Sequence, residues 1–267
     1  MQDAYLRWHG AARDEGDEIR NAQAFLTRVV TRLCLDQLKS ARRTRETYVG
    51  PWLPEPLLDA GAYGGEAAGE IAHDMSVALM LALERLSPLE RAAFILHDVF
   101  DLGFDEVGAA LGRTDAACRQ LSSRAREHVR QERPRFKVSA EEGNRFTAAF
   151  LKAMQSGDTA DLRGILAADA VLHSDGGGVR AAALNIIEGP DRIARFLEGV
   201  FHKFNAGTKL VRAIEINGQP GLITRDPDGG LQSVAIEVAH GMITAIYIVR
   251  NPHKLTHIEG SLSLGSH

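Results

Sequence analysis

A short glycine-containing turn between two amphipathic segments is the feature that most constrains the fold of this chain. Gly112 follows a predicted helix over residues 105–111 and suits the left-handed turn that ends a helix, because it lacks a β-carbon. Thr114 can cap the next predicted helix, from Asp115 to about Arg130, and Asp115 complements its dipole. Two helices joined by so short a turn predict a helix-turn-helix unit.

Signals before this turn extend the helical unit, which we expect to run from Leu86 to Phe136. Ser87 and Pro88 have the form of an N-cap followed by a proline at the first helical position. They predict a helix from Leu89 to Val99.

The helix after the turn is predicted to have one apolar and one basic face. Its apolar residues recur at helical spacing and should pack on the preceding helix. They are Cys118, Leu121, Ala125 and Val129, opposite Val107 and Leu111. The other face carries side chains that can reach base edges in a major groove or meet phosphates. The expected base contacts are Arg119, Gln120, Ser123 and Arg124, and the expected phosphate contacts are Arg126 and Arg130. A solvated basic helix is the alternative, but the agreement of capped turn, apolar packing and basic face favours DNA binding.

Basic residues cluster in two places, although the net charge of the chain is -4. One cluster extends from 113 to 137 and includes the helix after the turn. The other comprises Arg28, Arg32, Lys39, Arg42, Arg43 and Arg45, opposed by Asp36. Two separate basic surfaces predict two contacts with a polyanion.

The composition excludes several classes of protein. Hydrophobic residues make up 45% of the chain and charged residues 25%, and no apolar run could span a bilayer, so we expect a cytoplasmic protein of two or three domains. The start of the chain does not have the form of a signal peptide. Cys34 and Cys118 lie far apart without further metal-ligand residues at suitable spacing, which argues against a disulfide framework and a metal site. We interpret both cysteines as small buried apolar residues and expect no cofactor.

The rest of the chain predicts a leading helix, a linker and a second domain. The helix is expected over residues 17–43, and after Thr47 a proline- and glycine-rich linker precedes helices that resume near Ile71. From Ser139 onward, helices are expected over 142–155, 160–166 and 190–202, and strands over 210–216, 222–225, 233–238 and 243–249. This pattern predicts a compact α+β domain with a curved antiparallel sheet.

Three segments in the helix-turn-helix region carry a family resemblance: LSPLER at 86–91, FDEV at 104–107 and RQLSSRAR at 119–126. They resemble domain four of bacterial sigma factors of the extracytoplasmic-function group. In that family domain four reads the minus-thirty-five promoter element. The resemblance implies this role for the basic face described above.

Two segments near the start, QDAYLRW at 2–8 and AFLTRVVTRLCLD at 24–36, resemble the later helices of sigma domain two. The resemblance implies that the first helix contacts core RNA polymerase through Asp3, Leu6, Arg7 and Trp8. It also implies that Arg28, Arg32, Lys39, Arg42 and Arg43 lie on promoter DNA in the minus-ten region, where capturing a flipped base would be the physical task. Relatives carry further helices before the position of Met1, so the family pattern implies an incomplete domain two, by a start-site choice, a fragment or a natural loss.

Three further strings, WLPEP at 52–56, DGGG at 175–178 and NPHKL at 251–255, resemble signatures of the sigma-factor subgroup with a fused SnoaL-like domain of the NTF2-like fold. Two departures are visible: Val179 and Arg180 stand where relatives tend to have lysine then valine, and His253 replaces an acidic residue. The resemblance implies that the appended domain modulates activity in cis. The implied regulatory residues are Trp52, Leu53, Pro54, Glu55, Pro56, Asp175, Gly176, Gly177, Gly178, Asn251, Pro252, Lys254 and Leu255.

The resemblance also implies a division of the chain and a function. The expected parts are a partial sigma domain two (1–47), a linker (48–70), sigma domain four (71–136), a SnoaL-like domain (139–257) and a tail (258–267). We therefore expect a non-enzymatic alternative sigma factor that binds core RNA polymerase and promoter DNA.

Two alternatives remain open at this point. One is a ligand-sensing helix-turn-helix repressor, which would not need the second basic surface. The other is a SnoaL-type cyclase or isomerase tethered to DNA, since SnoaL-like domains include polyketide cyclases. Its candidate catalytic residues are His173, Asp175, His202 and Tyr247. Lone histidines and an aspartate beside glycines are more often turn or core features, so we expect no catalysis, although the pocket could bind a small ligand.

Overall fold

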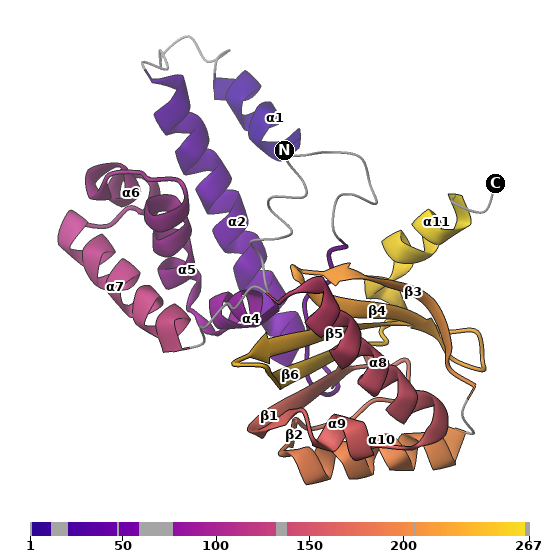
Figure 1. The fold of residues 1–267 in the computed structure, drawn as a ribbon. Coiled ribbons are helices and arrows are strands. Elements are labelled where there is room, and N and C mark those ends of the chain that lie inside the picture. The colour runs from indigo at the N-terminus through magenta and orange to yellow at the C-terminus, as the bar shows by residue number, and fades with distance from the viewer. Residues whose placement is uncertain are drawn as a thin grey trace. The chain divides into compact units, whose positions relative to one another are not determined.

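The computed structural model describes residues 2–11, 21–46, 48–58, 77–131, 138–204 and 207–264 (Figure 1). The chain divides into two compact units, one formed by Met1–Thr47 with Leu81–Arg133 and one by Tyr48–Met80 with Pro134–His267. The described residues of the expected linker, 48–58, therefore group with the second unit. Each unit is described separately below.

The first unit is helical. It contains α1 (Gln2–Ala11), α2 (Ala22–Glu46), the end of α4 (Val77–Arg85), α5 (Pro88–Phe94), the π-helical turn η2 (Ile95–Val99), α6 (Phe104–Leu111) and α7 (Asp115–Gln131). Within it α7 packs on α5 and α6, and α2 packs on α1, α5 and α6. The helix expected over 89–99 is α-helical only as far as Phe94 and continues as the π-helical turn.

The capping signals of this unit are confirmed. Ser87 Oγ accepts a hydrogen bond from the Glu90 amide at 3.3 Å, and the Ser87 amide donates to Glu90 Oε2 at 3.0 Å, which completes a capping box. Gly112 has φ 65° and ψ 43°, the left-handed conformation expected of it. Thr114 Oγ1 accepts from the Ala117 amide at 3.3 Å. These local bonds position α6 and α7 about the turn.

The core of the helix-turn-helix contains Ala93, Val107 and Cys118, all fully buried. Leu96, Leu102, Phe104, Leu111 and Leu121 pack around them. The predicted apolar face of α7 is therefore confirmed. The interpretation of the cysteines is correct for Cys118 and wrong for Cys34, which is exposed on α2. The expectation for Cys34 rested on its residue type alone, and the side chain lies on an exposed part of α2.

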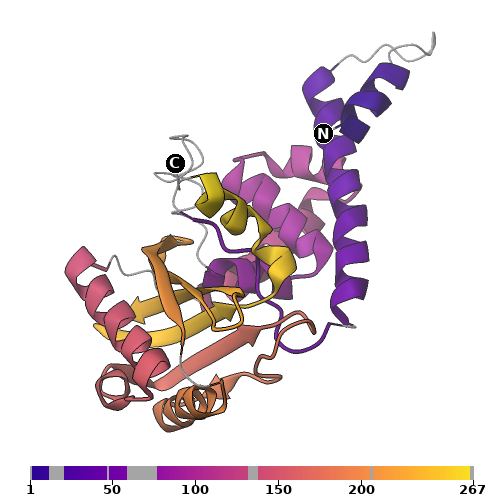
Figure 2. The same cartoon turned by 90° about the vertical axis from the view of Figure 1, so that its right-hand side faces the viewer.

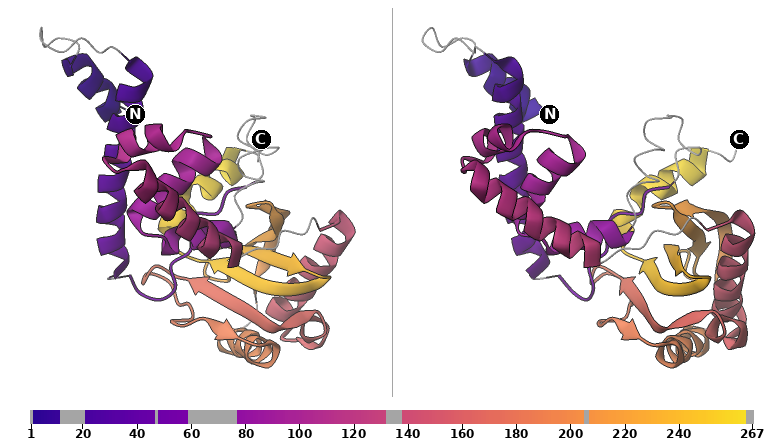
Figure 3. Two further views of the ribbon diagram at one scale, coloured as in Figure 1. Left: turned by 90° about the vertical axis from the view of Figure 1, so that its left-hand side faces the viewer. Right: turned by 60° about the vertical axis from the view of Figure 1, so that its left-hand side comes forward.

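The second unit is an α+β domain with a mixed sheet. Its elements are α8 (Ala140–Ser156), α9 (Ala160–Arg163), β1 (Leu166–Asp175), β2 (Ile187–Glu188), α10 (Pro190–Phe204), β3 (Lys209–Ile216), β4 (Gln219–Arg225), β5 (Leu231–Ala239), β6 (Met242–Val249), the short 3-10 turn η3 (Pro252–Lys254) and α11 (Thr256–Leu264). The strand order is β2-β1-β6-β5-β4-β3. The strands bend strongly, which gives the curved sheet that was predicted (Figure 3).

Strands β1 and β2 correct the sequence prediction. The expected sheet was wholly antiparallel, whereas β1 pairs in parallel with β6, so the sheet is mixed. The end of β1 is buried on both faces, from Leu172 to Asp175, so it lacks the alternating pattern by which strands are predicted. The residues expected to form a tail from 258 belong in part to α11, where Ile258 is fully buried.

Helices α8 and α10 lie on one face of the sheet, α8 against β4 and β3 and α10 against β1 and β2 (Figure 2). Their fully buried side chains include Phe146 and Phe150 of α8 and Leu197 of α10. These pack on Leu172 of β1 and Ile246 of β6. Because side chains alternate along a strand, the residues between these positions face the other side of the sheet. That opposite side holds the docking site described below.

No helix in the parts of the chain that the structure describes has both the length and the apolar character needed to cross a membrane.

Replacing Ser87 with alanine should destabilise the helical unit by about 1 kcal/mol, because the capping box loses its hydroxyl acceptor. Urea unfolding followed by circular dichroism measures this change. Ser123→Ala, at an exposed position of the neighbouring helix α7, is the matched control and should change stability by less than about 0.5 kcal/mol. Equal effects of the two changes would show that the capping box does not stabilise α5.

Candidate functional site

The basic face of α7 is exposed as the sequence predicted. Exposed side chains on it are Arg119, Gln120, Ser123, Arg124 and Arg126. Arg130 lies in α7, but its side chain is outside the described residues. The structure therefore brings the expected base-contacting side chains together on one helix face.

Two of these arginines also contact their own unit. The Arg119 guanidinium lies 5.3 Å from the centroid of the Phe104 ring, a cation-π contact across the turn. Arg126 Nε donates to Asp98 Oδ1 at 2.6 Å, and both side chains remain partly exposed. A phosphate approaching Arg126 would therefore share this cation with Asp98.

The second basic surface follows α2. Arg28 and Arg32 are exposed on this helix, while the side chains of Lys39, Arg42, Arg43 and Arg45 lie outside the described residues. On α1, Asp3, Leu6 and Arg7 are exposed. Trp8 instead packs edge-on against Phe25 of α2, with ring centroids 5.7 Å apart. The Trp8 ring thus joins α1 to α2, which leaves only part of it available to a partner.

In the second unit, a buried carboxylate binds the linker. Asp175 is fully buried at the end of β1. Its Oδ2 accepts from the Leu53 amide at 2.9 Å and from Lys254 Nζ at 2.7 Å. Its Oδ1 accepts from the Tyr48 hydroxyl at 2.6 Å and from the Gly177 amide at 3.0 Å. Four donors from three separate segments therefore meet at one side chain.

Lys254 contacts both the Asp175 carboxylate and the linker. Its Nζ donates to the Leu53 carbonyl at 2.5 Å as well as to Asp175. It also lies over the rings of Trp52, at 4.3 Å from the centroid, and Tyr48, at 4.9 Å. A lysine with a buried ion pair, a carbonyl and two aromatic faces is well compensated for leaving water.

Further contacts hold the linker on both sides of this centre. Asn251 Nδ2 donates to the Tyr48 hydroxyl at 2.8 Å. His257 Nε2 donates to the Pro56 carbonyl at 2.9 Å. Asn217 forms two hydrogen bonds with Leu57. The Asn217 backbone amide donates to the Leu57 carbonyl at 2.8 Å, and the Leu57 amide donates to Asn217 Oδ1 at 3.2 Å. We call the whole set, residues 48–58 with their partners in 175–178, 217 and 251–257, the linker-docking site.

Burial raises the pKa of the Tyr48 phenol well above its ordinary value, and the hydrogen bond to Asp175 raises it further. The phenol therefore stays protonated and can donate to the carboxylate at any physiological pH.

The glycines of the DGGG string are required by close approach of other segments. Gly177 has φ 63°, and a β-carbon there would collide with the Asn251 side chain. Gly178 has φ 72° and faces Val49 of the linker. Glycine accepts both the backbone conformation and the contact.

Most of the residues that the resemblance marked as regulatory lie in this site, with three exceptions. The side chains of Glu55 and Pro252 are exposed, and Leu255 is buried in the domain beside the site. The departure at His253 is also exposed, so it leaves the docking contacts unchanged. Tyr48, Asn217 and His257 were not predicted, because their partners are distant in the sequence.

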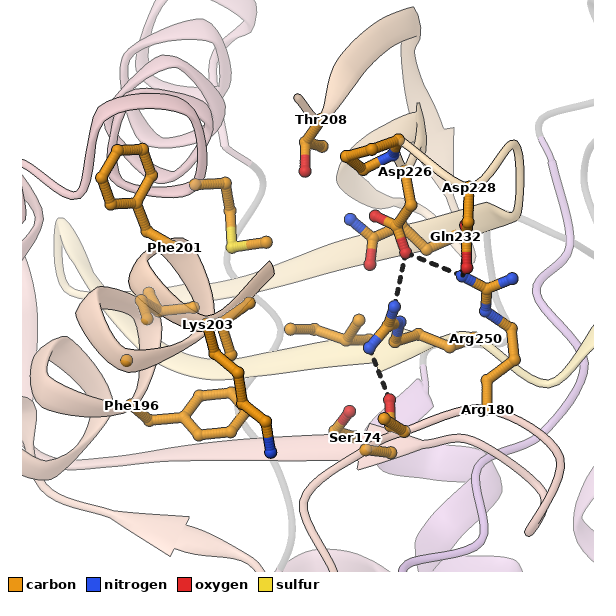
Figure 4. A pocket seen from close by; sticks show the side chains of 18 of the residues that line it. Ser174, Arg180, Phe196, Phe201, Lys203, Thr208, Asp226, Asp228, Gln232 and Arg250 are labelled. Carbon is orange, nitrogen blue, oxygen red and sulfur yellow. Dashed lines mark hydrogen bonds and ion pairs between the residues drawn. The ribbon is translucent and has the colours of Figure 1, made fainter. Parts of the chain in front are cut away.

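The four candidate catalytic residues do not form one site. His202 is exposed on α10, and Asp175 is engaged by the linker. His173 and Tyr247 do meet, with ring centroids 5.3 Å apart, and the Tyr247 hydroxyl donates to Glu237 Oε2 at 2.9 Å. None of the four lines the cavity of about 680 Å³ on the helix side of the sheet (Figure 4). Among the described residues, no three His, Cys, Asp or Glu side chains are grouped to hold a metal ion.

Charged residues form a network at one end of this cavity. Arg180 binds Asp226 at 3.0 Å and Asp228 at 2.8 Å, and Arg250 binds Asp226 and donates to the Ala181 carbonyl. The hydrogen bonds from Arg180 hold the pKa of Asp228 below its ordinary value. The departure from the family pattern at Arg180 thus supplies one of the cations of this network.

Comparison with known proteins shows the class of protein to which these features belong. The family model for sigma-70, region 4, matches residues 76–129. The ECF RNA polymerase sigma factor SigJ of Mycobacterium tuberculosis (strain ATCC 25618 / H37Rv) is 36% identical, over 96% of this chain and 84% of the relative. The chain therefore belongs to the extracytoplasmic-function (ECF) sigma factors.

Two further similarities support this assignment. The probable ECF RNA polymerase sigma factor SigI of Mycobacterium tuberculosis (strain CDC 1551 / Oshkosh) is 29% identical, over 99% of this chain and 88% of the relative. The crystal structure of Mycobacterium tuberculosis SigJ matches with a TM-score of 0.71 at 34% identity, over 96% of this chain and 87% of that one.

Family membership confirms the main prediction from sequence. The protein is an alternative sigma factor of transcription initiation, a non-enzymatic factor that acts with core RNA polymerase and promoter DNA. Its second unit is an α+β domain with a curved sheet, as predicted, and it belongs to the part of the chain that matches the SigJ crystal structure. The repressor and the tethered cyclase are therefore not retained.

Replacing Lys254 with methionine should release the linker, because it leaves the buried Asp175 carboxylate without its cation, at a cost of about 3–5 kcal/mol. Hydrogen exchange of the amides in residues 48–58 should become faster, and urea unfolding should begin earlier. Adding Asp175→Asn should restore part of the loss, because it removes the uncompensated charge. Lys152→Met, which breaks only exposed ion pairs with Asp158 and Asp161, is the control and should leave exchange in 48–58 unchanged.

Proposed function

We propose that this sigma factor recognises two promoter elements through its two basic surfaces and that its C-terminal domain modulates this activity in cis by holding the linker. The observation that carries the regulatory part is the buried Asp175–Lys254 pair, which binds both the amide and the carbonyl of Leu53. A factor that acts on promoter DNA in this way would be located in the cytoplasm.

The minus-thirty-five element is assigned to α7. Arg119 and Arg124 can donate to guanine edges and Gln120 can pair with adenine, since all three are exposed on one face of a helix held by a capped turn. Ser123 extends this base-contacting face. Arg126, and Arg130 one turn further along α7, are assigned to phosphates, which set the register of the helix on the duplex.

The minus-ten region is assigned to α2. Arg28 and Arg32 are exposed there, and Lys39, Arg42 and Arg43 continue the helix sequence toward its end. A positive helix surface can follow an unpaired strand, which needs charge neutralisation more than base-edge contacts. Core polymerase is assigned to α1, where Asp3, Leu6 and Arg7 are exposed and Trp8 is half-buried.

In this proposal, docking of the linker regulates promoter binding because it limits how the two DNA-binding surfaces can be placed. Residues 48–58 lie between the segments that contain the two DNA-binding surfaces, so holding them shortens the chain available to connect these surfaces. Promoter elements have a fixed spacing. Both surfaces belong to the first unit, in which α2 packs on α5 and α6. A docked linker therefore favours this packed arrangement, and an undocked linker permits others.

We also propose that the cavity of the C-terminal domain binds a small molecule. Its volume of about 680 Å³ lies within the range of small-molecule sites, and its lining is mainly apolar with charged groups at one end.

Replacing Arg119 or Gln120 with alanine should weaken promoter binding by about 1–3 kcal/mol, because each change removes a contact to a base edge. Run-off transcription with purified core polymerase and footprinting on the same promoter measure the loss. Arg145→Ala, an exposed arginine on α8 of the other unit, is the control and should leave both unchanged. If the α7 variants weakened all DNA equally, α7 would be a phosphate-binding rather than a base-reading helix.

Undocking the linker should change transcription while the helix-turn-helix of α6 and α7 keeps its fold. Lys254→Met and the pair Trp52→Ala with Pro54→Ala remove different contacts of the same site, so both should shift run-off transcript yield in the same direction. A form ending near Val138 tests whether the helical part is active alone. Lys152→Met should behave as the native chain. Unchanged yield from both undocking variants would contradict regulation by the linker.

A further inference from the structure

The cavity of the C-terminal domain has two chemically different ends (Figure 4). One end is apolar and is formed mainly by α10, which contributes Phe196, Leu197, Val200 and Phe201. Met154 of α8 completes this end. The other end is polar and contains Asp226, Asp228, Arg180, Arg250 and Gln232. Such a division fits a molecule that has an apolar body and a polar head.

Buried nitrogen donors at the polar end have no acceptor among the described residues. Gln232 is 2% exposed and lines the cavity, and its Nε2 has no hydrogen-bond partner. The Nε atoms of Arg180 and Arg250 are also buried without a partner. Because buried polar groups in proteins are nearly always paired, these donors indicate a missing acceptor.

The charge of the lining indicates that this acceptor is an anion. The acidic residues are Asp226 and Asp228, and both are already bound by arginines. At the polar end Arg180 and Arg250 equal these aspartates in number. Arg195 and Lys203 of α10 lie elsewhere in the lining, so that over the whole cavity cations outnumber carboxylates. The partial neutralisation by two aspartates favours a single negative charge over a multiply charged phosphate.

We propose that this cavity binds an amphipathic monocarboxylic acid. The carboxylate would accept from Gln232 Nε2 beside Arg250, and the apolar body would lie between the phenylalanines and Met154. This proposal deepens the ligand site of the proposed function and rests on it.

The site is joined to the linker-docking site through the backbone. Ser174 lines the cavity, and the next residue, Asp175, binds the linker. Arg250 lines the cavity, and the next residue, Asn251, binds Tyr48. The amides of Arg250 and Asn251 both donate to the Asp175 carbonyl, at 2.7 and 3.0 Å. A carboxylate bound at Arg250 would therefore act on the segment that holds the linker.

The test is isothermal titration of the full chain with octanoate, octylamine and 1-octanol, which share one apolar chain and differ in the head. Octanoate should bind at least about tenfold more tightly than the other two, because only its head supplies a charged acceptor. Equal binding of the three, tighter binding of the amine, or no heat of binding for octanoate would overturn the proposal. The titration contains neither polymerase nor DNA, so its failure is distinct from failure of the promoter and linker proposals.

Two variants distinguish loss of the Gln232 donor from general damage to the fold. Gln232→Leu should weaken octanoate binding by about tenfold while leaving the thermal midpoint unchanged or higher, because it removes a buried donor that has no partner in the free protein. Gln219→Leu is the matched control: Gln219 is also buried in the sheet with an unpaired amide atom, Oε1, but does not line the cavity. Equal loss of binding in the two variants would overturn the assignment of Gln232.

Discussion

The docking of the linker on the C-terminal domain depends on the hydrogen bonds that the buried Asp175 carboxylate accepts. A charge removed from water is tolerated only when donors replace the lost hydration, and here the donors come from the linker, the DGGG turn and the end of the chain. The carboxylate thus makes three distant segments depend on one another. Removing one of them leaves a buried charge uncompensated, which explains why such a site can hold a proline-containing segment that forms no helix or strand of its own.

The alternation of side chains along β1 separates two tasks. Ser174 faces the cavity, whereas Asp175 faces the linker. The same separation occurs where β6 ends, at Arg250 and Asn251. The sheet therefore carries the cavity on one face and the linker on the other. Asp175, which could have been catalytic by residue type, is engaged in holding the linker.

The sequence predicted best what depends on near neighbours. The capping box at Ser87, the left-handed Gly112 and the cap at Thr114 each involve residues within a few positions, and all three were found as expected. Strand β1 was missed because both of its faces are buried and its partner β6 is far along the chain. Tyr48, Asn217 and His257 were missed for the same reason. The docking strings themselves were recognised by resemblance, and Cys34 shows that residue type alone does not determine burial.

The order of the docking segments along the chain has a consequence for the newly made protein. Residues 48–58 are synthesised before their partners in the docking site, and of these partners Lys254 and His257 are made last. The helix-turn-helix, built from local contacts, can fold well before that point. Each molecule therefore passes through a period in which helix α7 is formed and the linker is still undocked.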